Sequence, residues 1–500
     1  MSMIKKWEKL FLSKNQNNKL KILLMLIEKS RINMAMLEDT LEITTRIGRN
    51  LLEELRVEIA NVNNDPLFQL INEDKVYYLG PEFDSKKYTY LYNSIKKRYF
   101  NSSASYVVLL FFLEKRKSSI AEVAMELMYS QSYSYKLIDL VNDIFVEAGL
   151  TIQLEKYDSG VELVGEEIEI RLFHYCSVIY IYNNLEWPFN YFSRNKVERI
   201  QNYVNYHNTK MLSENNQLKR SIIDTIYLQS IHNGKKITAF EKDSVEIYEL
   251  FEQSFNSVTL SQYIQHNSSL SAAEAKSEIR HLYFFINYVI PEFLSAKEKQ
   301  KIGSHLFTME ENNIVKLSLA TLKLIPEECF FDESTKFIFM YELTTRFIIF
   351  KDFKLWQFNQ ETIKNEFFLK MQKDVYRQVT GIYVDELEGE ALHYFVRQII
   401  EIFSPYLLFT YDKSIKVYTE FYHKAPYKLI LDNSISFTYN KKSLALVKTV
   451  AEADIVISDV YPVGETSSKE YFYFSDIYIK QNWEELNRFL QKKILERGFE

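Results

Sequence analysis

The side chains best suited to chemistry in this sequence form a polar and cationic cluster near residue 45. They are Thr45, Arg46, Arg49 and Asn50. An arginine can neutralise a phosphate or pair bidentately with guanine, and an asparagine can pair with adenine. The cluster therefore predicts contact with a nucleic acid duplex through both phosphates and base edges.

The elements around this cluster have the spacing of a helix-turn-helix. Apolar residues recur at helical spacing from Leu20 to Ile27, and a short second helix is predicted at 34–41. A third helix is predicted over Thr45–Ile59, capped by the hydroxyl of Thr44 or Thr45. Its apolar stripe is predicted to consist of Ile47, Leu51, Leu52 and Leu55. The opposite face would then present the polar cluster to the major groove.

A hairpin is predicted to follow these helices. The runs Leu67–Ile71 and Lys75–Leu79 flank the polar segment 72–74, which is typical of a short wing. An ordinary three-helix bundle with solvated arginines explains this first pattern equally well when it is taken alone.

The same plan recurs, which favours the winged interpretation. Helices are predicted at Ala104–Leu113, Ser119–Met128 and Ser132–Glu147, and a second hairpin at 151–154 and 160–164. The third of these helices is predicted to bury Leu137, Leu140, Val141 and Ile144. The residues predicted to bind DNA are Lys115, Arg116, Lys117, Ser132, Tyr135 and Lys136. Asp139 lies on the exposed face and would repel phosphate, so only the first turn should touch DNA.

Composition and charge set the broad class. With 11 Gly and 8 Pro in 500 residues, the chain is predicted to be mainly helical. The net charge of −6 does not exclude DNA binding, because basic residues can gather on one face. Residues 1–60 hold 11 Lys and Arg against 8 Asp and Glu, a net +3, and residues 86–160 hold 10 against 8, a net +2.

Several other classes of protein are disfavoured. The longest apolar run, residues 106–113, is far shorter than a membrane helix. Cys176 and Cys329 stand in apolar surroundings without metal-ligand spacing. We find no Gly-rich phosphate loop and no nucleophile–base pair. We therefore expect a cytoplasmic protein that is not an enzyme and has no catalytic residues, metal, cofactor or membrane contact.

Four segments resemble the Mga/AtxA family of Gram-positive virulence and metabolic regulators. They read LEDTLEITTRIGRNLLEEL (37–55), SIAEVAMELMYSQSYSYKLIDLVN (119–142), ELVGEEIEIRLFHY (162–175) and IYLQSIHNGKKI (226–237). The third resembles the entry into a phosphotransferase-regulation domain, and the fourth resembles a later helix end of such a domain. Gln229 and Ser230 stand where the family often has an arginine.

The resemblance implies five domains in a mainly α, multidomain chain. They are winged helix-turn-helix domains at 1–82 and 83–165, helical-bundle regulatory domains at 166–290 and 291–405, and an α/β domain resembling enzyme IIB at 406–500. In the regulatory domains, histidines can accept phosphate from the phosphotransferase system through HPr. The candidates are His207, His266, His305 and His393, whereas His281 is expected to pack in the core.

The C-terminal region is predicted to alternate strands and helices. Strands are predicted at Ile415–Phe421, Ser434–Tyr439 and Asp454–Asp459, and helices at Lys442–Ala453 and Trp483–Ile494. The enzymatic version of such a domain carries a phosphorylated cysteine after its first strand. This chain has His423 in that loop and no cysteine beyond Cys329, so the resemblance implies dimerisation or sensing instead.

The function implied is a DNA-binding transcriptional regulator, expected to be an activator. Its expected partners are promoter DNA, a second copy of the chain, HPr and RNA polymerase. The alternative is an RNA-binding antiterminator with the same regulatory domains. Those proteins begin with a short β-rich RNA-binding domain, whereas this N-terminus has a helical period.

Overall fold

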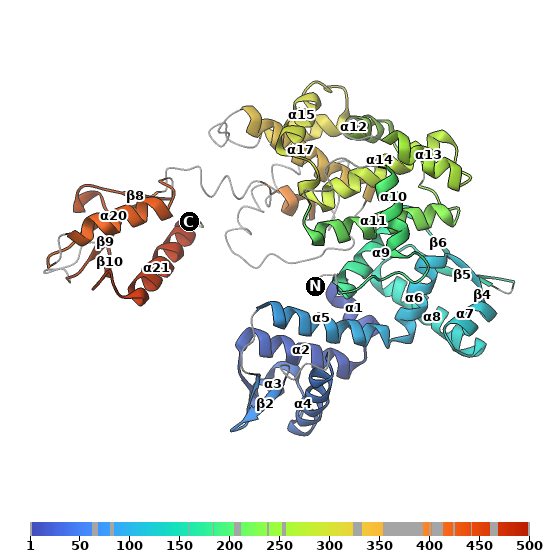
Figure 1. Ribbon diagram of the computed structural model, residues 1–500, viewed down its shortest axis with the longest axis horizontal. Helices are drawn as coiled ribbons and strands as arrows, with labels where there is room; N and C mark the ends of the chain where they lie inside the picture. The colour runs from blue at the N-terminus through green and yellow to red at the C-terminus, as the bar shows by residue number, and fades with distance from the viewer. Residues whose placement is uncertain are drawn as a thin grey trace. The chain divides into compact units, whose positions relative to one another are not determined.

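The described part of the chain is mainly helical (Figure 1). The computed structural model describes residues 3–62, 69–80, 85–158, 160–183, 185–204, 212–237, 240–252, 257–323, 333–353, 394–399, 402, 414–423, 426–441, 443–460 and 469–498. Two compact units are present. The first comprises Met1–Lys316 and Thr344–Thr362, and the second comprises Leu317–Leu343 and Ile363–Glu500.

The first module, at the start of the first unit, combines helices with a small antiparallel sheet. Its helices are α1 (Met3–Phe11), α2 (Lys14–Lys29), α3 (Met34–Leu41), α4 (Thr45–Ala60) and α5 (Ser85–Asn101). Its strands are β1 (Ile32–Asn33), β2 (Leu70–Glu73) and β3 (Val76–Leu79), in the order β1-β3-β2. The predicted helix-turn-helix order and the hairpin are therefore present, and α1, α5 and β1 are additional.

Local signals in the sequence explain the boundaries of these helices. Ser13 and Gln16 form a capping box at the start of α2, Asn33 caps α3, and Thr44 caps α4. Leu51, Leu52, Leu55 and Ile59 of α4 are buried. The predicted burial of Ile47 is wrong, because this residue lies in the first turn and is 43% exposed.

The hairpin of the first module turns later than predicted. Asp74 and Lys75 both have positive φ, at 50° and 67°, which is the conformation of a two-residue hairpin turn. Glu73 consequently pairs with Val76, whereas the predicted turn lay at 72–74.

The second module has the same order of elements. Its helices are α6 (Ala104–Lys115), α7 (Ile120–Glu126) and α8 (Gln131–Ala148), and its strands are β4 (Lys117–Ser119), β5 (Gln153–Tyr157) and β6 (Gly160–Val164). Strands β5 and β6 form the predicted hairpin, and β4 is an unpredicted strand on the other edge of β6. In α8, Leu137, Val141 and Ile144 are buried as predicted. Leu140 is instead 44% exposed, and Ile138 is buried.

Helices continue beyond the second module. They are α9 (Glu167–Tyr182), α10 (Arg194–Val204), α11 (Glu214–His232), α12 (Lys242–Glu252), α13 (Ser257–Asn267), α14 (Ala272–Val289), α15 (Ala296–Leu306), α16 (Asn313–Leu322) and α17 (Glu333–Ile348). A short 3-10 turn, Pro291–Phe293, follows α14, and a π-helical turn, Ile349–Phe353, follows α17. We call the part from α9 to α14 the helical block.

The C-terminal part of the second unit contains a parallel sheet. Strands β7 (Ile415–Glu420), β8 (Leu444–Leu446), β9 (Ile455–Ser458) and β10 (Glu470–Tyr473) pair in the order β10-β9-β7-β8. Helices α20 (Pro426–Thr438) and α21 (Lys480–Gly498) contribute Leu431, Leu486 and Leu490 to the core of this sheet.

Two elements predicted in this region are wrong. The segment 434–439, predicted as a strand, lies mostly in α20, where Leu431 and Ile435 are buried four residues apart on one helix face. The segment 442–453, predicted as a helix, contains β8 and the 3-10 turn Val450–Glu452. The predictions around β7, β9 and α21 are confirmed.

A buried lysine joins the first module to the helical block. The ammonium of Lys96, in α5, lies 4.0 Å from the ring centroid of Tyr180 and 5.3 Å from that of Tyr92. Both tyrosine hydroxyls donate hydrogen bonds to Glu8. Burial lowers the pKa of Lys96 to about 8, although the negative charge of Glu8 opposes this shift. The junction therefore holds a cation that is easier to deprotonate than a solvated lysine.

We expect Lys96 to make the stability of the protein depend on pH in the alkaline range. Because its pKa falls from 10.5 to about 8 on folding, the folded state binds fewer protons between these values, so stability rises with pH there. Lys96→Met removes this effect. Its free energy of unfolding relative to wild type, measured in urea, should decrease by about 1.5 kcal/mol from pH 8 to pH 9.5. A constant difference would show that Lys96 is normally solvated.

Candidate nucleic-acid interface

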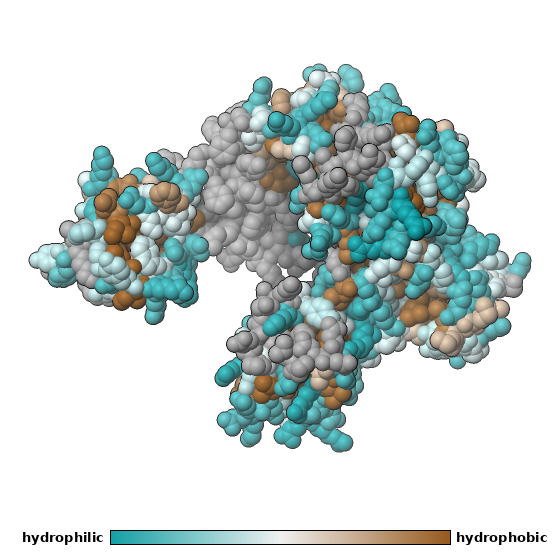
Figure 2. Space-filling view, viewed as in Figure 1, coloured by the Kyte–Doolittle hydropathy of each residue, from teal (hydrophilic) through white to brown (hydrophobic). Residues whose placement is uncertain are grey.

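The first turn of α4 presents the polar cluster that the sequence predicts. Thr45, Arg46, Arg49 and Asn50 are all exposed. Among the described residues, neither Arg46 nor Arg49 forms an ion pair or hydrogen bond with another side chain. The positive end of the helix dipole lies at the same place, so the tip of α4 is a cationic surface. In Figure 2 the surface around α4 is mostly hydrophilic.

Contacts with α3 hold this tip in position. The hydroxyl of Thr45 donates a hydrogen bond to Glu38 of α3. Gly48 is buried, and a Cβ atom built on it would lie 2.8 Å from the sulfur of Met34. The absence of a side chain at Gly48 therefore lets α3 approach α4 closely, on the side of α4 away from the two arginines.

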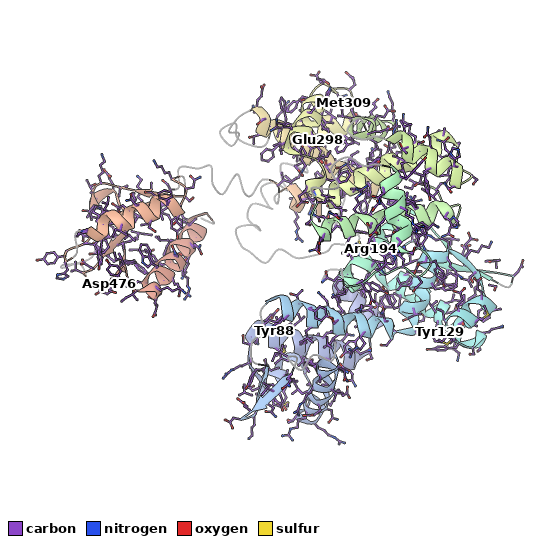
Figure 3. All side chains as sticks on the ribbon, in the orientation of Figure 1. Tyr88, Tyr129, Arg194, Glu298, Met309 and Asp476 are labelled. Carbon is purple, nitrogen blue, oxygen red and sulfur yellow. The ribbon has the colours of Figure 1, made fainter. Side chains whose placement is uncertain are left out.

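The tip of α8 is exposed but less cationic. Ser130 caps this helix by accepting a hydrogen bond from the backbone of Tyr133. Ser132, Tyr135 and Lys136 are exposed, as predicted for a DNA-facing first turn. Tyr129, labelled in Figure 3 in the turn before α8, packs edge-on against Tyr133. This tip thus combines one lysine with hydroxyl and aromatic groups.

A lysine of the hairpin compensates the acidic residue on α8. Lys156 of β5 forms an ion pair with Asp139, and its ammonium lies 5.5 Å from the ring centroid of Tyr135. The predicted repulsion between Asp139 and phosphate is therefore reduced by a partner from the wing. Sequence reasoning missed Lys156 as a site residue, although its place in the predicted hairpin was visible.

The structure contradicts the predicted DNA contact of Arg116. This residue is only 1% exposed, and its guanidinium donates to Glu167 and Ser230 inside the protein. A buried side chain cannot reach a phosphate, so Arg116 is a structural residue. In the sequence, three successive basic residues do not reveal which of them is buried at the end of α6 and which is exposed.

Lys115 and Lys117, the neighbours of Arg116 in the sequence, also have acidic partners. Lys115 pairs with Glu122 and Glu126 of α7. Burial by itself lowers the pKa of Lys115, but the hydrogen bonds to these carboxylates outweigh it and raise the pKa. Lys117 remains exposed, with its ammonium 3.4 Å from Glu162. Lys115 is therefore committed to α7, and Lys117 is the accessible cation of the predicted basic run.

The described candidate histidines lie on helix surfaces. His266 of α13 and His305 of α15 are exposed, and their Nδ1 atoms lie 2.7 and 3.0 Å from the carbonyl oxygens of Gln262 and Lys301. His207 and His393 lie outside the described residues. His281 is completely buried, which confirms its predicted place in the core.

The described residues also bear on metal binding and on membrane crossing. No group of three or more His, Cys, Asp or Glu side chains there could hold a metal ion. No helix in the described ranges has both the length and the apolar character that crossing a membrane requires.

Comparison with known families identifies the second module. Residues 88–177 match the model of the Mga helix-turn-helix domain. The chain therefore contains an Mga helix-turn-helix domain. The match begins within α5, includes all of the second module and ends within α9. No curated protein matches the chain. An Mga helix-turn-helix domain makes this protein a DNA-binding transcriptional regulator.

We expect the Lys156–Asp139 pair to support DNA binding by the second module. Lys156→Met leaves the carboxylate of Asp139 uncompensated, and duplex affinity should fall about tenfold at low salt. Adding Asp139→Asn should restore most of the loss, because the repulsive charge is then absent. Fluorescence anisotropy with a labelled promoter duplex measures the affinity of the single and the double variant. A double variant as weak as Lys156→Met would show that Lys156 acts on DNA directly.

Proposed function

We propose that this protein is a transcriptional activator that binds promoter DNA through two winged helix-turn-helix modules. The observation that carries the proposal is the exposed tip of α4, where Arg46 and Arg49 have no partner among the described side chains. A buried or paired arginine would serve structure, whereas two solvated arginines at a helix N-terminus suit phosphate and guanine. Helical elements at the N-terminus weigh against the alternative RNA-binding antiterminator.

The two modules are proposed to contribute differently. In the first, Arg46 and Arg49 bind phosphate or guanine and Asn50 reads adenine. In the second, Lys136 and Lys117 supply modest charge, and Ser132 and Tyr135 add polar contacts. Because the charge of each module is small, useful affinity requires several modules on one duplex, and therefore a dimer.

The helical parts of the chain are proposed to be two phosphotransferase-regulation domains that receive phosphate from HPr. His266 and His305 suit this role, because Nδ1 donates to a carbonyl of the same helix and Nε2 remains as the nucleophilic nitrogen. Phosphorylation adds negative charge and new hydrogen-bond acceptors, which can reorder a helix surface. We propose that it modulates dimerisation and DNA binding.

The C-terminal α/β domain is proposed to be an enzyme IIB-like dimerisation domain without catalytic activity. The chain has no cysteine beyond Cys329 that could carry phosphate in the loop after β7. The backbone N–H groups of Tyr422 and His423 in this loop donate to the carboxylate of Asp459, at 2.7 and 3.0 Å. The protein's own carboxylate therefore occupies donors that could otherwise hold an external anion.

We expect Arg46→Ala with Arg49→Ala to abolish promoter binding without unfolding the protein. Below the salt concentration at which the variant loses binding, removing two phosphate contacts should reduce the slope of log affinity against log salt by about 2. Gel shifts over a series of salt concentrations measure both quantities. Arg56→Ala is a matched control, since Arg56 is an exposed arginine of the same helix that lies near Glu53. Unchanged affinity of the double variant at moderate salt would contradict the proposal.

We expect HPr and a phosphoenolpyruvate-driven phosphotransfer system to phosphorylate the purified protein on histidine. His266→Ala and His305→Ala should each remove part of the acid-labile label, which autoradiography measures. His232→Ala is the matched control, because His232 is an exposed helix-terminal histidine outside the candidate set. If the variant that lacks both His266 and His305 is still fully labelled, phosphorylation occurs on other residues.

A further inference from the structure

The C-terminal end of α6 attaches the second module to the helical block. Nη2 of Arg116 donates to Glu167 of α9 at 3.0 Å and to Ser230 of α11 at 2.8 Å. Arg116 has a φ of 66°, a conformation that L residues rarely adopt, and its carbonyl accepts from Leu163 of β6. One residue therefore connects the last turn of α6, the wing sheet and two helices of the helical block.

The carboxylate of Glu114 makes a second connection two residues earlier. It accepts from the backbone N–H groups of Asn190 and Tyr191, in the segment between α9 and α10, and from the amide of Gln229. The side chain of Asn233 donates in turn to the backbone carbonyl of Glu114. Gln229 and Ser230, adjacent on α11, thus serve Glu114 and Arg116 respectively.

The ion pair of Arg116 continues into the helical block. Arg171 donates to Glu167 at 2.7 Å and to Glu278 of α14 at 2.5 Å. Glu278 also accepts from the backbone of Ile237, which follows α11. Although burial by itself raises the pKa of Glu167, the charges of Arg116 and Arg171 outweigh it and lower the pKa. These groups form a continuous, nearly completely buried chain of opposite charges.

Such a chain resists rotation of the module. Charges removed from water are stable only while their partners stay in place, and separating a buried pair leaves an uncompensated charge. Turning the second module away from α9 and α11 would separate Arg116 from Glu167 and Glu114 from its amide donors together. In a flexibly tethered domain, these charged residues would be exposed to solvent instead of buried.

We propose that Glu114 and Arg116 are positioning residues that fix the second module on the helical block, so that α9, α11 and α14 set the direction in which α8 meets DNA. The inference rests on the proposed function for its effect on DNA, where both modules must meet one duplex. A shift of α11 against α14 then re-aims α8 without any change in α8 itself.

Distances between spin labels test the attachment without DNA. Labels are placed at Val146→Cys of α8 and Arg199→Cys of α10, both exposed, with Cys176 and Cys329 replaced by serine. We expect one narrow distance distribution, which Arg116→Met broadens at least twofold. Arg116→Lys should restore most of the narrow component, because it keeps the charge. A distribution that stays narrow in Arg116→Met overturns the proposal.

The control and a milder variant separate positioning from general loss of stability. Arg280→Met removes an arginine that pairs with Glu249 and Glu252 within the helical block, and it should leave the distribution narrow. Ser230→Ala removes one bond to Arg116 from α11 and should broaden the distribution partly, which keeps the test open if Arg116→Met fails to fold. Broadening as large in Arg280→Met as in Arg116→Met overturns the proposal.

Footprinting of a promoter duplex provides the functional arm. Arg116→Met should shorten the protected region and weaken binding to the long site about tenfold, while the weaker affinity for a short duplex that accommodates one module stays unchanged. A full footprint combined with a broadened distance distribution overturns the role in DNA binding. If the unsubstituted protein binds no DNA, the proposed function fails, whereas the distance measurement still decides the attachment.

Discussion

The buried chain of charges that runs from Arg116 through Glu167 and Arg171 to Glu278 is the constraint on which this regulator's architecture depends. It joins the end of α6 to α9 and α14, across more than 160 positions of sequence, and Arg116 also bonds to Ser230 of α11. Each charge is stable in the interior only because the next one is present. The second module and the helical block are parts of one compact unit.

The distribution of charge explains how an acidic chain can bind DNA. Most cations of the second module are neutralised by neighbouring carboxylates, as Lys115 is by Glu122 and Lys156 is by Asp139. Arg46 and Arg49 have no such partners among the described residues. The tip of α4 therefore keeps a local concentration of positive charge, and α8 presents mainly hydroxyl and aromatic groups. A net charge summed over the chain hides this concentration.

Periodicity predicted the modules well, because it reports directly which residues can face a core. The order of α2, α3, α4 and the first hairpin, and of α6, α7, α8 and the second hairpin, follows from apolar spacing and capping residues. The same reasoning failed for Ile47 and Leu140, which have the right spacing but are 43% and 44% exposed. It failed also for 434–439, where β-branched and aromatic residues suggested a strand within what is helix α20.

The sequence alone determined the helix-turn-helix order, the exposed Arg46 and Arg49, and the core position of His281, because spacing and capping act within a few residues. Only the tertiary structure decided that Arg116 is internal while Lys117 is exposed, and that Lys156 compensates Asp139. Adjacent basic residues look alike in a sequence. Which of them meets a carboxylate, and which meets solvent, depends on elements that lie far away along the chain.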